Sequence, residues 1–360
     1  MVTTMEFNSI FKNKKVFLTG HTGFKGAWMS VWLSILGANV KGYALKPDQP
    51  SLYKMIGKKL KNLQSVIADI RNKDRLEKEI LSFRPDFIFH MAAQPLVRES
   101  YNIPLETFDV NVMGTAHLLE ALRKLKKKCT VIIVTTDKVY KNNETGKPFK
   151  EEDPLGGHDP YSASKAASEI ITASYRLSFF HPDHYKVHKK AIATARAGNV
   201  IGGGDFAKDR IIPDLIRAFA AGKPADIRNP KAIRPWQHVL EPLSGYLTLA
   251  AAMSKSPKKF SGSFNFGPHL KDALPVETLV TLALKNWGHG DYKIAKNQKP
   301  LHEAGMLKLN ISKAKNDLKW VPVWNAKQAI SKTISWYKNV VPNNNIAFEF
   351  CLKDISDFSK

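Results

Sequence analysis

The stretch Lys15-Val16-Phe17-Leu18-Thr19-Gly20-His21-Thr22-Gly23-Phe24-Lys25-Gly26 decides how the first part of the chain folds. Its apolar run, 15–19, predicts a buried strand, and residues 26–36 predict a helix directly after it. The three glycines between them allow a tight turn, a close approach to a pyrophosphate and close packing of the helix on the strand. Free N–H groups at the start of the helix also favour an anion. We therefore predict a dinucleotide-binding loop with the contacts Gly20, Thr22, Gly23, Phe24, Lys25 and Gly26.

Alternating strands and helices continue this pattern through the first half of the chain. Short runs rich in β-branched residues alternate with longer helical segments, which is typical of a parallel sheet covered on both faces. Crossover connections in such a sheet are right-handed. The sequence therefore predicts an α/β fold with a doubly wound, Rossmann-type parallel sheet. The further predicted strands are 38–45, 66–68, 87–91, 131–134 and 191–195, and the predicted helices are 73–83, 107–125 and 162–179.

A second, smaller domain is expected in the C-terminal part of the chain. Beyond Asn199 the pattern loosens, because glycines and prolines interrupt it. We expect a smaller C-terminal α/β domain that binds the substrate and is interleaved with the end of the first domain. The predicted boundaries are 1–198 with about 229–262 for the dinucleotide-binding domain, 199–228 with 263–341 for the substrate domain, and 342–360 for a C-terminal tail.

The composition excludes several classes of protein. No run of about 18 apolar residues is present, so we predict no membrane span. The N-terminus lacks the apolar core of a secretory signal. Two cysteines, Cys129 and Cys351, cannot form a disulfide framework. We therefore expect a cytoplasmic protein.

The net charge of +23, from 55 Lys and Arg against 32 Asp and Glu, raises the question of nucleic-acid binding. The lysines fall in short, separate runs without interleaved aromatic residues, and no nucleic-acid-binding motif accompanies them. We therefore predict that nucleic acid is not the main partner. The histidine-rich stretch 181–188 is predicted to be a polar loop without a metal, because spacing alone rarely makes a metal site.

The adenosine end of the predicted cofactor site lacks one expected residue. The second strand ends near Leu45 with no acidic side chain to hold the ribose, and Asp48 is a substitute. Lys46 instead favours a 2′-phosphate, so NADP stays open as the alternative to NAD, which we predict. Further predicted cofactor contacts are Asp69 and Ile70 after the third strand, and Ala92 and Ala93 after the fourth.

The stretch Tyr161-Ser162-Ala163-Ser164-Lys165 places a phenol and an ammonium four residues apart, on one face of a predicted helix. A tyrosine titrates near ~10, too high for a base at neutral pH. The neighbouring ammonium and a nicotinamide cation are expected to lower the pKa of Tyr161, and Lys165 can also bond the nicotinamide ribose. We predict that both residues are catalytic and that both bind the cofactor.

Three polar residues, Thr136, Asp137 and Lys138, follow the fifth predicted strand, at the edge where ligands lie in an open parallel sheet. Thr136 is predicted to hydrogen-bond the substrate hydroxyl that Tyr161 deprotonates. Simple ketone–alcohol exchange does not need the Asp-Lys pair. Elimination of water does, because one group removes a proton from carbon while another protonates the departing hydroxyl. A salt bridge at the strand end is the alternative interpretation.

Five longer stretches carry a resemblance to a known family. They are GHTGFKG (20–26), TTDKVY (135–140), DPLGGHDPYSASKAASE (153–169), ARAGNVIGGGD (195–205) and IRNPKAIRPWQHVLEPLSGYL (227–247). Up to about Pro268 the chain resembles the extended short-chain dehydrogenases/reductases, also called the NAD-dependent epimerase/dehydratase family. Within that family it is most similar to the 4,6-dehydratases of CDP-hexoses, since dTDP-sugar dehydratases usually carry Asp-Glu at the position of Asp137-Lys138.

The resemblance implies a hydro-lyase that converts CDP-D-glucose to CDP-4-keto-6-deoxy-D-glucose. In the implied mechanism Tyr161, supported by Thr136 and Lys165, removes the proton of the 4-hydroxyl as hydride leaves carbon 4 for NAD. Lys138 then removes the proton of carbon 5, which requires a depressed pKa. Asp137 helps to protonate the leaving 6-hydroxyl, and the hydride returns to carbon 6.

The substrate end of the site is assigned partly by the resemblance and partly by side-chain chemistry. The family pattern implies that Asn199, after the sixth strand, contacts the diphosphate–sugar region. Arg228 and Arg234 are predicted to clamp the diphosphate, because guanidinium groups match phosphate oxygens. The predicted substrate-binding residues are Asn199, Arg210, Arg228, Arg234, Gln237 and His238.

The family further implies a homodimer that pairs the helices predicted at 107–125 and 162–179, and a place in deoxysugar synthesis for O-antigen or lipopolysaccharide. Three alternatives stay open. A nucleotide-sugar 4-epimerase would share the tyrosine, lysine and threonine but would not need the Asp-Lys pair. The others are a dehydratase that acts on another nucleotide, and a catalytically silent relative that senses nucleotides or binds nucleic acid.

Overall fold

A seven-stranded parallel sheet forms the centre of the protein, whose computed structural model describes residues 4–295 and 307–360. The strand order is β11-β6-β5-β4-β1-β2-β3, which confirms the predicted doubly wound arrangement. Residues 296–306 of the predicted substrate domain lie outside the described residues. The strands of the sheet are β1 (Lys15–Thr19), β2 (Asn39–Ala44), β3 (Leu63–Ile67), β4 (Phe87–His90), β5 (Cys129–Val134), β6 (Lys190–Ala197) and β11 (Ser263–Phe266).

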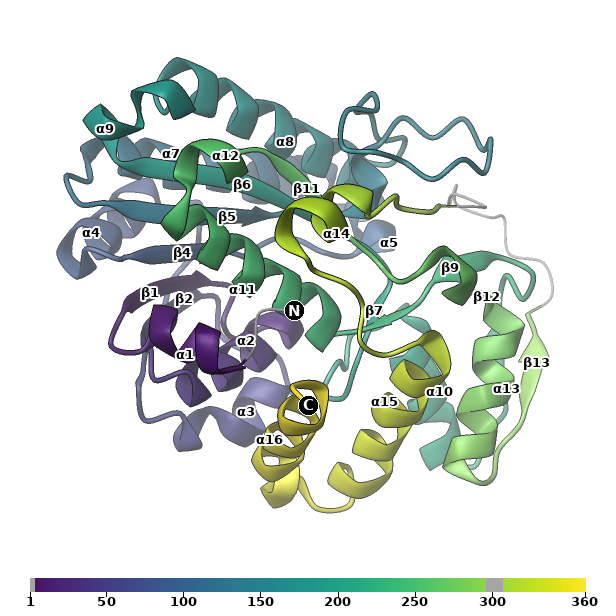
Figure 1. Cartoon of the computed structure of the whole chain (residues 1–360). Helices are drawn as coiled ribbons and strands as arrows, with labels where there is room; N and C mark the ends of the chain where they lie inside the picture. The colour runs from purple at the N-terminus through teal and green to yellow at the C-terminus, as the bar shows by residue number, and fades with distance from the viewer. Residues whose placement is uncertain (1–3, 296–306) are drawn as a thin grey trace.

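Side chains alternate between the two faces of the sheet, and a layer of helices covers each face (Figure 1). In β1, Val16 and Leu18 join one apolar cluster, whereas Phe17 joins the other. Burial on both faces explains why the strand sequences are almost continuously apolar. One face is covered by α1 (Thr4–Phe11), α2 (Phe24–Ile35) and α11 (Leu240–Lys255), and the other by α4 (Lys73–Phe83), α7 (Gly114–Lys124) and α8 (Pro160–Ser178).

A smaller lobe stands beyond the carboxyl ends of the strands. It is built on short two-stranded ladders that pair β8 with β13, β9 with β12 and β7 with β10. Helix α11 returns from this lobe to pack on β5 and β6. The elements of this part are β7 (Val200–Ile201), α10 (Ile211–Ala220), β8 (Ala225–Ile227), β9 (Ile233–Pro235), β10 (Gln237–His238), β12 (Ala273–Pro275), α13 (Val276–Trp287) and β13 (Tyr292–Ile294).

Shorter helices connect these layers. Those next to the sheet or the site are α3 (Leu52–Ile56), α5 (Val97–Asn102), α6 (Pro104–Phe108), α9 (Tyr185–His188) and α12 (Pro257–Phe260), and the chain ends with α14 (Ser312–Leu318), α15 (Ala326–Val340) and α16 (Ala347–Phe358). Single 3-10 turns lie at Gly57–Lys59, Asp137–Val139, Pro182–His184, Leu270–Asp272 and Asn344–Ile346.

Three predicted elements differ in the structure. Residues 263–266 fall within the predicted substrate domain, but as β11 they pair with β6 and form the edge strand of the main sheet. The helix predicted at 107–125 is divided, because a π-helical turn, Asp109–Met113, separates α6 from α7. The tail predicted at 342–360 contains α16, which packs against α2 and α3. Local sequence pattern does not reveal these long-range contacts, and the remaining domain boundaries stay a prediction.

No helix in the described part of the chain is long and apolar enough to cross a lipid bilayer. Within residues 4–295 and 307–360, no group of three His, Cys, Asp or Glu side chains is placed to hold a metal ion. The histidine-rich stretch predicted as a loop forms the turn at 182–184 and α9.

The contact between α16 and the phosphate-side helix α2 can be tested through Phe358. Its ring lies 5.8 Å from that of Trp32 and 5.1 Å from that of Trp324, measured between centroids. We expect Phe358→Ala to lower the free energy of unfolding by about 3–5 kcal/mol, because it leaves a cavity between α2, α16 and the segment before α15. Urea unfolding measures the change. The exposed Ser356→Ala on the same helix is the control, and equal stability of the two variants would contradict the packing.

Candidate active site

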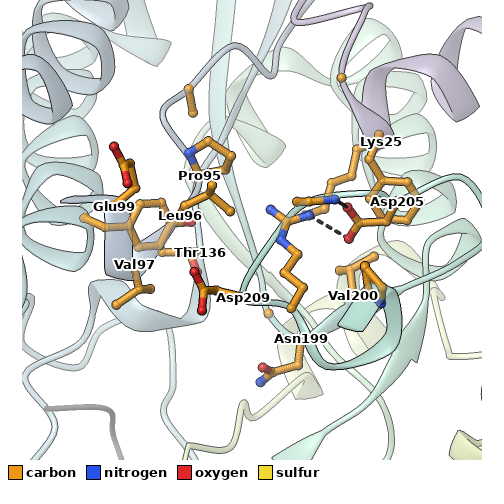
Figure 2. Close-up of a pocket in the computed structure, with 18 of the residues that line it drawn as sticks. Lys25, Pro95, Leu96, Val97, Glu99, Thr136, Asn199, Val200, Asp205 and Asp209 are labelled. Carbon is orange, nitrogen blue, oxygen red and sulfur yellow. Dashed lines mark hydrogen bonds and ion pairs between the residues drawn. The ribbon is translucent and has the colours of Figure 1, made fainter. Parts of the chain in front are cut away.

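A cavity of about 1050 Å³ lies at the carboxyl ends of the strands, between the sheet and the smaller lobe. Ligand pockets usually measure about 300–1,000 Å³, so the cavity has room for more than one small molecule. Figure 2 shows Lys25 and Asp205 on one side of it and Leu96, Val97 and Glu99 on the other. Every predicted cofactor residue lines the cavity: Gly20, Thr22, Gly23, Phe24, Lys25, Gly26, Asp69, Ile70, Ala92, Ala93, Tyr161 and Lys165.

The glycine loop forms a cradle suited to a pyrophosphate. Helix α2 begins after Gly23, which has no side chain to cap the first N–H groups. A Cβ at Gly26 would collide with the backbone of Gly20, so the loop closes this tightly only with glycine at that position. Burial lowers the pKa of Lys25 to about 7, and the charges of Arg210 and Lys165 act in the same direction. The cradle and the helix dipole together favour an anion at this place.

The adenosine side of the cavity is lined by Asp48 and Asp69, whereas Lys46 is not among the described residues that line it. The position of Lys46 therefore does not support the alternative that this lysine binds the 2′-phosphate of NADP. Asp69 contacts Arg71 at 2.7 Å, and this hydrogen-bonded guanidinium holds the pKa of Asp69 below its usual value. The Tyr43 phenol donates to the Asp69 carbonyl oxygen at 2.8 Å, which fixes the end of β3 beside β2.

Asp137 is completely buried after the end of β5, and its carboxylate holds the polar side chains around it in place. The Lys138 ammonium and the Thr136 hydroxyl each donate to its Oδ1 at 3.0 Å. The Asn199 amide donates to Oδ2 at 3.4 Å. A Cβ at Gly198 would collide with the same carboxylate, so the end of β6 passes this close only as glycine. Thr136, Lys138 and Asn199 line the cavity, and Asp137 lies behind them.

Tyr161 also faces the cavity, and a hydrogen bond joins its phenol to the Thr136 hydroxyl. Burial raises the pKa of Tyr161, while the Lys138 ammonium and the Thr136 hydrogen bond oppose that rise. Lys165 instead donates to the Val134 carbonyl oxygen at 3.2 Å. The expectation that Lys165 lowers the pKa of Tyr161 is therefore not met, because the cations that act on the phenol are Lys138 and, less strongly, Arg210.

The two lysines of the site differ in their pKa. Burial lowers the pKa of Lys165 to about 8, against the opposing charge of Glu169. Burial also acts against the charge of Lys138, but Asp137 and Tyr161 outweigh it, so the pKa of Lys138 is raised. The depressed pKa expected of Lys138 was wrong for this arrangement, because the sequence did not show that the Asp137 carboxylate bonds it directly.

Four of the predicted substrate residues line the cavity: Asn199, Arg210, Arg228 and Arg234. The Arg210 guanidinium donates to Asp205 at 2.8 Å. That of Arg228 donates to Asp209 at 3.0 Å. The Arg234 guanidinium donates to the backbone oxygen of Ile233.

Gln237 and His238 do not line the cavity, which corrects their prediction as substrate contacts. The Gln237 amide donates to the carbonyl oxygens of Gly198 and Phe266, so it ties two strand ends together. His238 is completely buried between Trp28 and Trp324. Burial lowers the pKa of His238 to about 3, so this imidazole is neutral.

Comparisons with known proteins agree with this geometry. The family model described as GDP-mannose 4,6 dehydratase matches residues 17–333. The chain belongs to this family. It is 45% identical to the CDP-glucose 4,6-dehydratase of Salmonella typhimurium (strain LT2) over 353 residues, 97% of each chain.

Solved structures share the fold. A dTDP-glucose 4,6-dehydratase from Bacillus anthracis in complex with NAD superposes with a TM-score of 0.74, at 24% identity, over 91% of this chain and 98% of that one. An epimerase from Methanothermobacter thermautotrophicus gives 0.77, at 19% identity, over 95% and 97%. Because both identities are low, these two likenesses establish the fold of the chain.

Sequence reasoning missed a buried ion pair between α8 and the sheet, next to the predicted site residues. Glu169 and Arg196 are 2% and 3% exposed, and they contact one another at 2.8 Å. The Glu169 carboxylate also accepts from Thr135 at 2.5 Å and from Thr194 at 2.7 Å. This carboxylate thus joins α8 to β5 and β6. Glu169 follows Lys165 by four residues, a spacing that places both on one helix face and was the available signal.

A second missed residue positions Tyr161. The Tyr161 backbone N–H donates to the Ser100 hydroxyl at 3.1 Å, and Ser100 is completely buried. This bond holds the first turn of α8 against α5. A serine on a short helix carries no pattern that distinguishes it in the sequence.

The Glu169–Arg196 pair gives a stability prediction. We expect Glu169→Gln to lower the free energy of unfolding by about 3–5 kcal/mol, because it leaves the buried Arg196 charge unpaired. Glu349→Gln is the matched control. Its carboxylate contacts Lys59 at 2.6 Å but is 57% exposed, so its loss is expected to cost about 0–1 kcal/mol. Chemical unfolding of both variants measures the difference, and similar values would refute the burial argument.

Proposed function

We propose that this chain is an NAD-dependent hydro-lyase that converts CDP-D-glucose to CDP-4-keto-6-deoxy-D-glucose. One observation carries the proposal: an Asp137–Lys138 ion pair meets the Thr136–Tyr161 hydrogen bond on the wall of a cavity that also contains the glycine loop. A 4-epimerase needs Tyr161, Thr136 and Lys165 but has no use for an acid–base pair beside them. The 45% identical relative is a CDP-glucose 4,6-dehydratase, which supports cytidine as the base.

The residues present fit NAD. The glycine cradle would hold the pyrophosphate, Lys165 the nicotinamide ribose, and the wall around Asp69 and Ile70 the adenine. NAD, when bound, supplies the hydride acceptor for carbon 4 of the sugar and the donor for carbon 6. The chain's own residues must therefore move two protons and hold the sugar still.

Tyr161 takes the first proton, from the 4-hydroxyl. Burial favours the neutral phenol, so its proton leaves only while positive charge is close. Lys138 supplies that charge in the structure, and the Tyr161 phenol is hydrogen-bonded to the Thr136 hydroxyl. The phenol is thus placed beside groups that stabilise the phenolate, the form that accepts the proton of the 4-hydroxyl.

Lys138 and Asp137 handle the second proton. A proton shift along their 3.0 Å contact converts the ion pair into a neutral amine and a carboxylic acid, the two forms that elimination requires. The positive charge of Arg234 favours this shift, because it acts against the charge of Lys138. The amine removes the proton of carbon 5, and the ammonium so formed would return a proton to carbon 5 once carbon 6 has accepted the hydride. The proton that Tyr161 took from the 4-hydroxyl then passes to the Lys138 amine, so that both groups regain their starting forms. Asp137 lies behind the wall, so its proton reaches the 6-hydroxyl through the Thr136 hydroxyl, 3.0 Å away.

The function is tested by incubating the protein and NAD with CDP-, dTDP-, GDP- and UDP-glucose. The alkaline ultraviolet absorbance of a 4-keto-6-deoxy sugar reports dehydration. We expect this product from CDP-glucose in preference to the others. A 4-epimer without the keto product would replace the proposal with an epimerase, and preference for another sugar nucleotide would correct the base.

Replacing Lys138 tests whether this side chain removes the proton of carbon 5. We expect Lys138→Met to reduce product formation by roughly 10²–10⁴-fold, the usual contribution of a general base. Uptake of deuterium from solvent at carbon 5 should fall in parallel. The exposed neighbour Lys141 provides a matched control, Lys141→Met, which should keep both rates. Full activity of Lys138→Met would remove this lysine from the mechanism.

A homodimer is part of the proposal. Apolar side chains that lie exposed gather on α6, α8 and the π-helical turn, elements that contact one another. Ile170 and Leu177 are seven residues apart on α8, so they share one face, and Leu105 is 84% exposed beside them. A second copy of the chain that presents the same face would cover these side chains.

The dimer is tested with Ile170→Glu, which places a charge in the middle of that face. We expect it to convert the dimer to a monomer, as measured by sedimentation or light scattering. Ile294→Glu changes an equally exposed isoleucine, 57% in both cases, on β13 of the smaller lobe, and should remain dimeric. A monomeric unsubstituted chain would contradict the proposal.

The location and pathway of the protein complete the proposal. We propose a cytoplasmic enzyme that supplies a 4-keto-6-deoxy intermediate for deoxysugars of O-antigen or lipopolysaccharide. Its net charge of +23 does not point to nucleic acid, because the lysines fall in short, separate runs and no nucleic-acid-binding motif accompanies them.

A further inference from the structure

One exposed carboxylate joins the two walls of the cavity. Asp209 contacts Arg228 at 3.0 Å and Arg98 at 3.5 Å, both through the same oxygen, Oδ1. Arg98 belongs to α5 beside the main sheet, and Arg228 follows β8 in the smaller lobe. All three residues line the cavity. In Figure 2 Asp209 lies near the wall formed by Leu96, Val97 and Glu99.

The backbone aims Asp209 at the two arginines. Its φ of 60° lies in the left-handed region, which non-glycine residues adopt at a cost. The side chain of the next residue, Arg210, has a different partner and donates a hydrogen bond to Asp205 at 2.8 Å. The short turn before α10 therefore places neighbouring side chains of opposite charge on different partners.

An exposed ion pair normally contributes little, about 0–1 kcal/mol, so stability alone does not explain this arrangement. Two guanidinium groups also exceed the charge of one carboxylate, so the cluster keeps a net positive charge. Guanidinium groups bind phosphate oxygens in pairs of parallel hydrogen bonds, which a single shared oxygen does not satisfy. A diphosphate has more acceptor oxygens and more charge than Asp209 offers.

We propose that Arg98 and Arg228 together bind the diphosphate of the nucleotide sugar, and that Asp209 is the counter-ion that the diphosphate displaces. This proposal rests on the proposed function, because it concerns the substrate of the same cavity. Arg228 was predicted from the sequence as a phosphate clamp, and Arg98 is the addition. The pair selects nucleoside diphosphates over monophosphates and nucleosides, and ligand binding fixes α5 against the smaller lobe.

The test measures binding of CDP, CMP and cytidine to the NAD-loaded full chain by titration calorimetry. Arg98→Gln should weaken CDP binding roughly tenfold, the usual effect of losing one charged hydrogen-bond partner, and leave cytidine binding unchanged. Arg98→Lys should weaken it less, because the charge stays and the fork is lost. Asp209→Asn should act in the opposite direction and tighten CDP binding about threefold or more, because the competing charge is gone.

Arg75→Gln is the matched control, since Arg75 is an exposed arginine that pairs with a carboxylate, Glu79 on α4, and does not line the cavity among the described residues. CDP binding within twofold of the unsubstituted chain in Arg98→Gln would overturn the proposal, as would an equal loss for cytidine. Asp209→Asn that fails to tighten CDP binding would overturn the displacement.

A separate measurement tests the proposed function. If the unsubstituted chain forms no 4-keto-6-deoxy product, the proposed function is wrong, whatever the variants bind. If that chain prefers dTDP, UDP or GDP over CDP, the same comparison is made with the preferred diphosphate, its monophosphate and its nucleoside. Absence of binding by all four diphosphates would overturn both proposals.

Discussion

The Asp137 carboxylate is an anion without solvent, and the carboxyl edge of the sheet is arranged around it. A buried charge is tolerated only when nearby groups neutralise it and bond its oxygens. Lys138, Thr136 and Asn199 do so from β5 and from the residues after β6. Gly198 leaves the space that the carboxylate occupies. One anion therefore sets both the position of the Lys138 ammonium and the path of two neighbouring strand ends.

Positive charge inside the cavity is held in two different ways. Lys25 and Lys165 lie in positions where burial depresses their pKa, to about 7 and about 8, so their charge responds to a ligand that brings negative charge. Arg210 and Arg228 remain charged and are paired with carboxylates at the cavity wall. A diphosphate that enters the cavity thus meets two kinds of cation. The two lysines are only partly protonated, and the two arginines are already paired with carboxylates. The negative charge of the diphosphate favours protonation of the lysines and attracts the arginines.

Much of this architecture could be predicted from the sequence, because the strands are buried on both faces and read as continuous apolar runs. The glycine loop and the residues after β5 were found because their chemistry follows directly from their place after a strand. Gln237 and His238 were misplaced, since adjacency to Arg234 along the chain does not reveal which side faces the cavity. The raised pKa of Lys138 depends on a three-dimensional contact and on the burial of its partner, which no local pattern encodes.

The C-terminal helix has a consequence for how the protein is made. Trp32, on the helix that begins at the phosphate cradle, packs against Phe358 near the end of the chain. The N-terminal half therefore leaves the ribosome with this aromatic surface uncovered, and it gains its cover only when the 12 residues of α16 emerge. Premature termination shortly before the end would yield a chain with an intact catalytic sequence and an exposed apolar patch, a substrate for quality-control proteases.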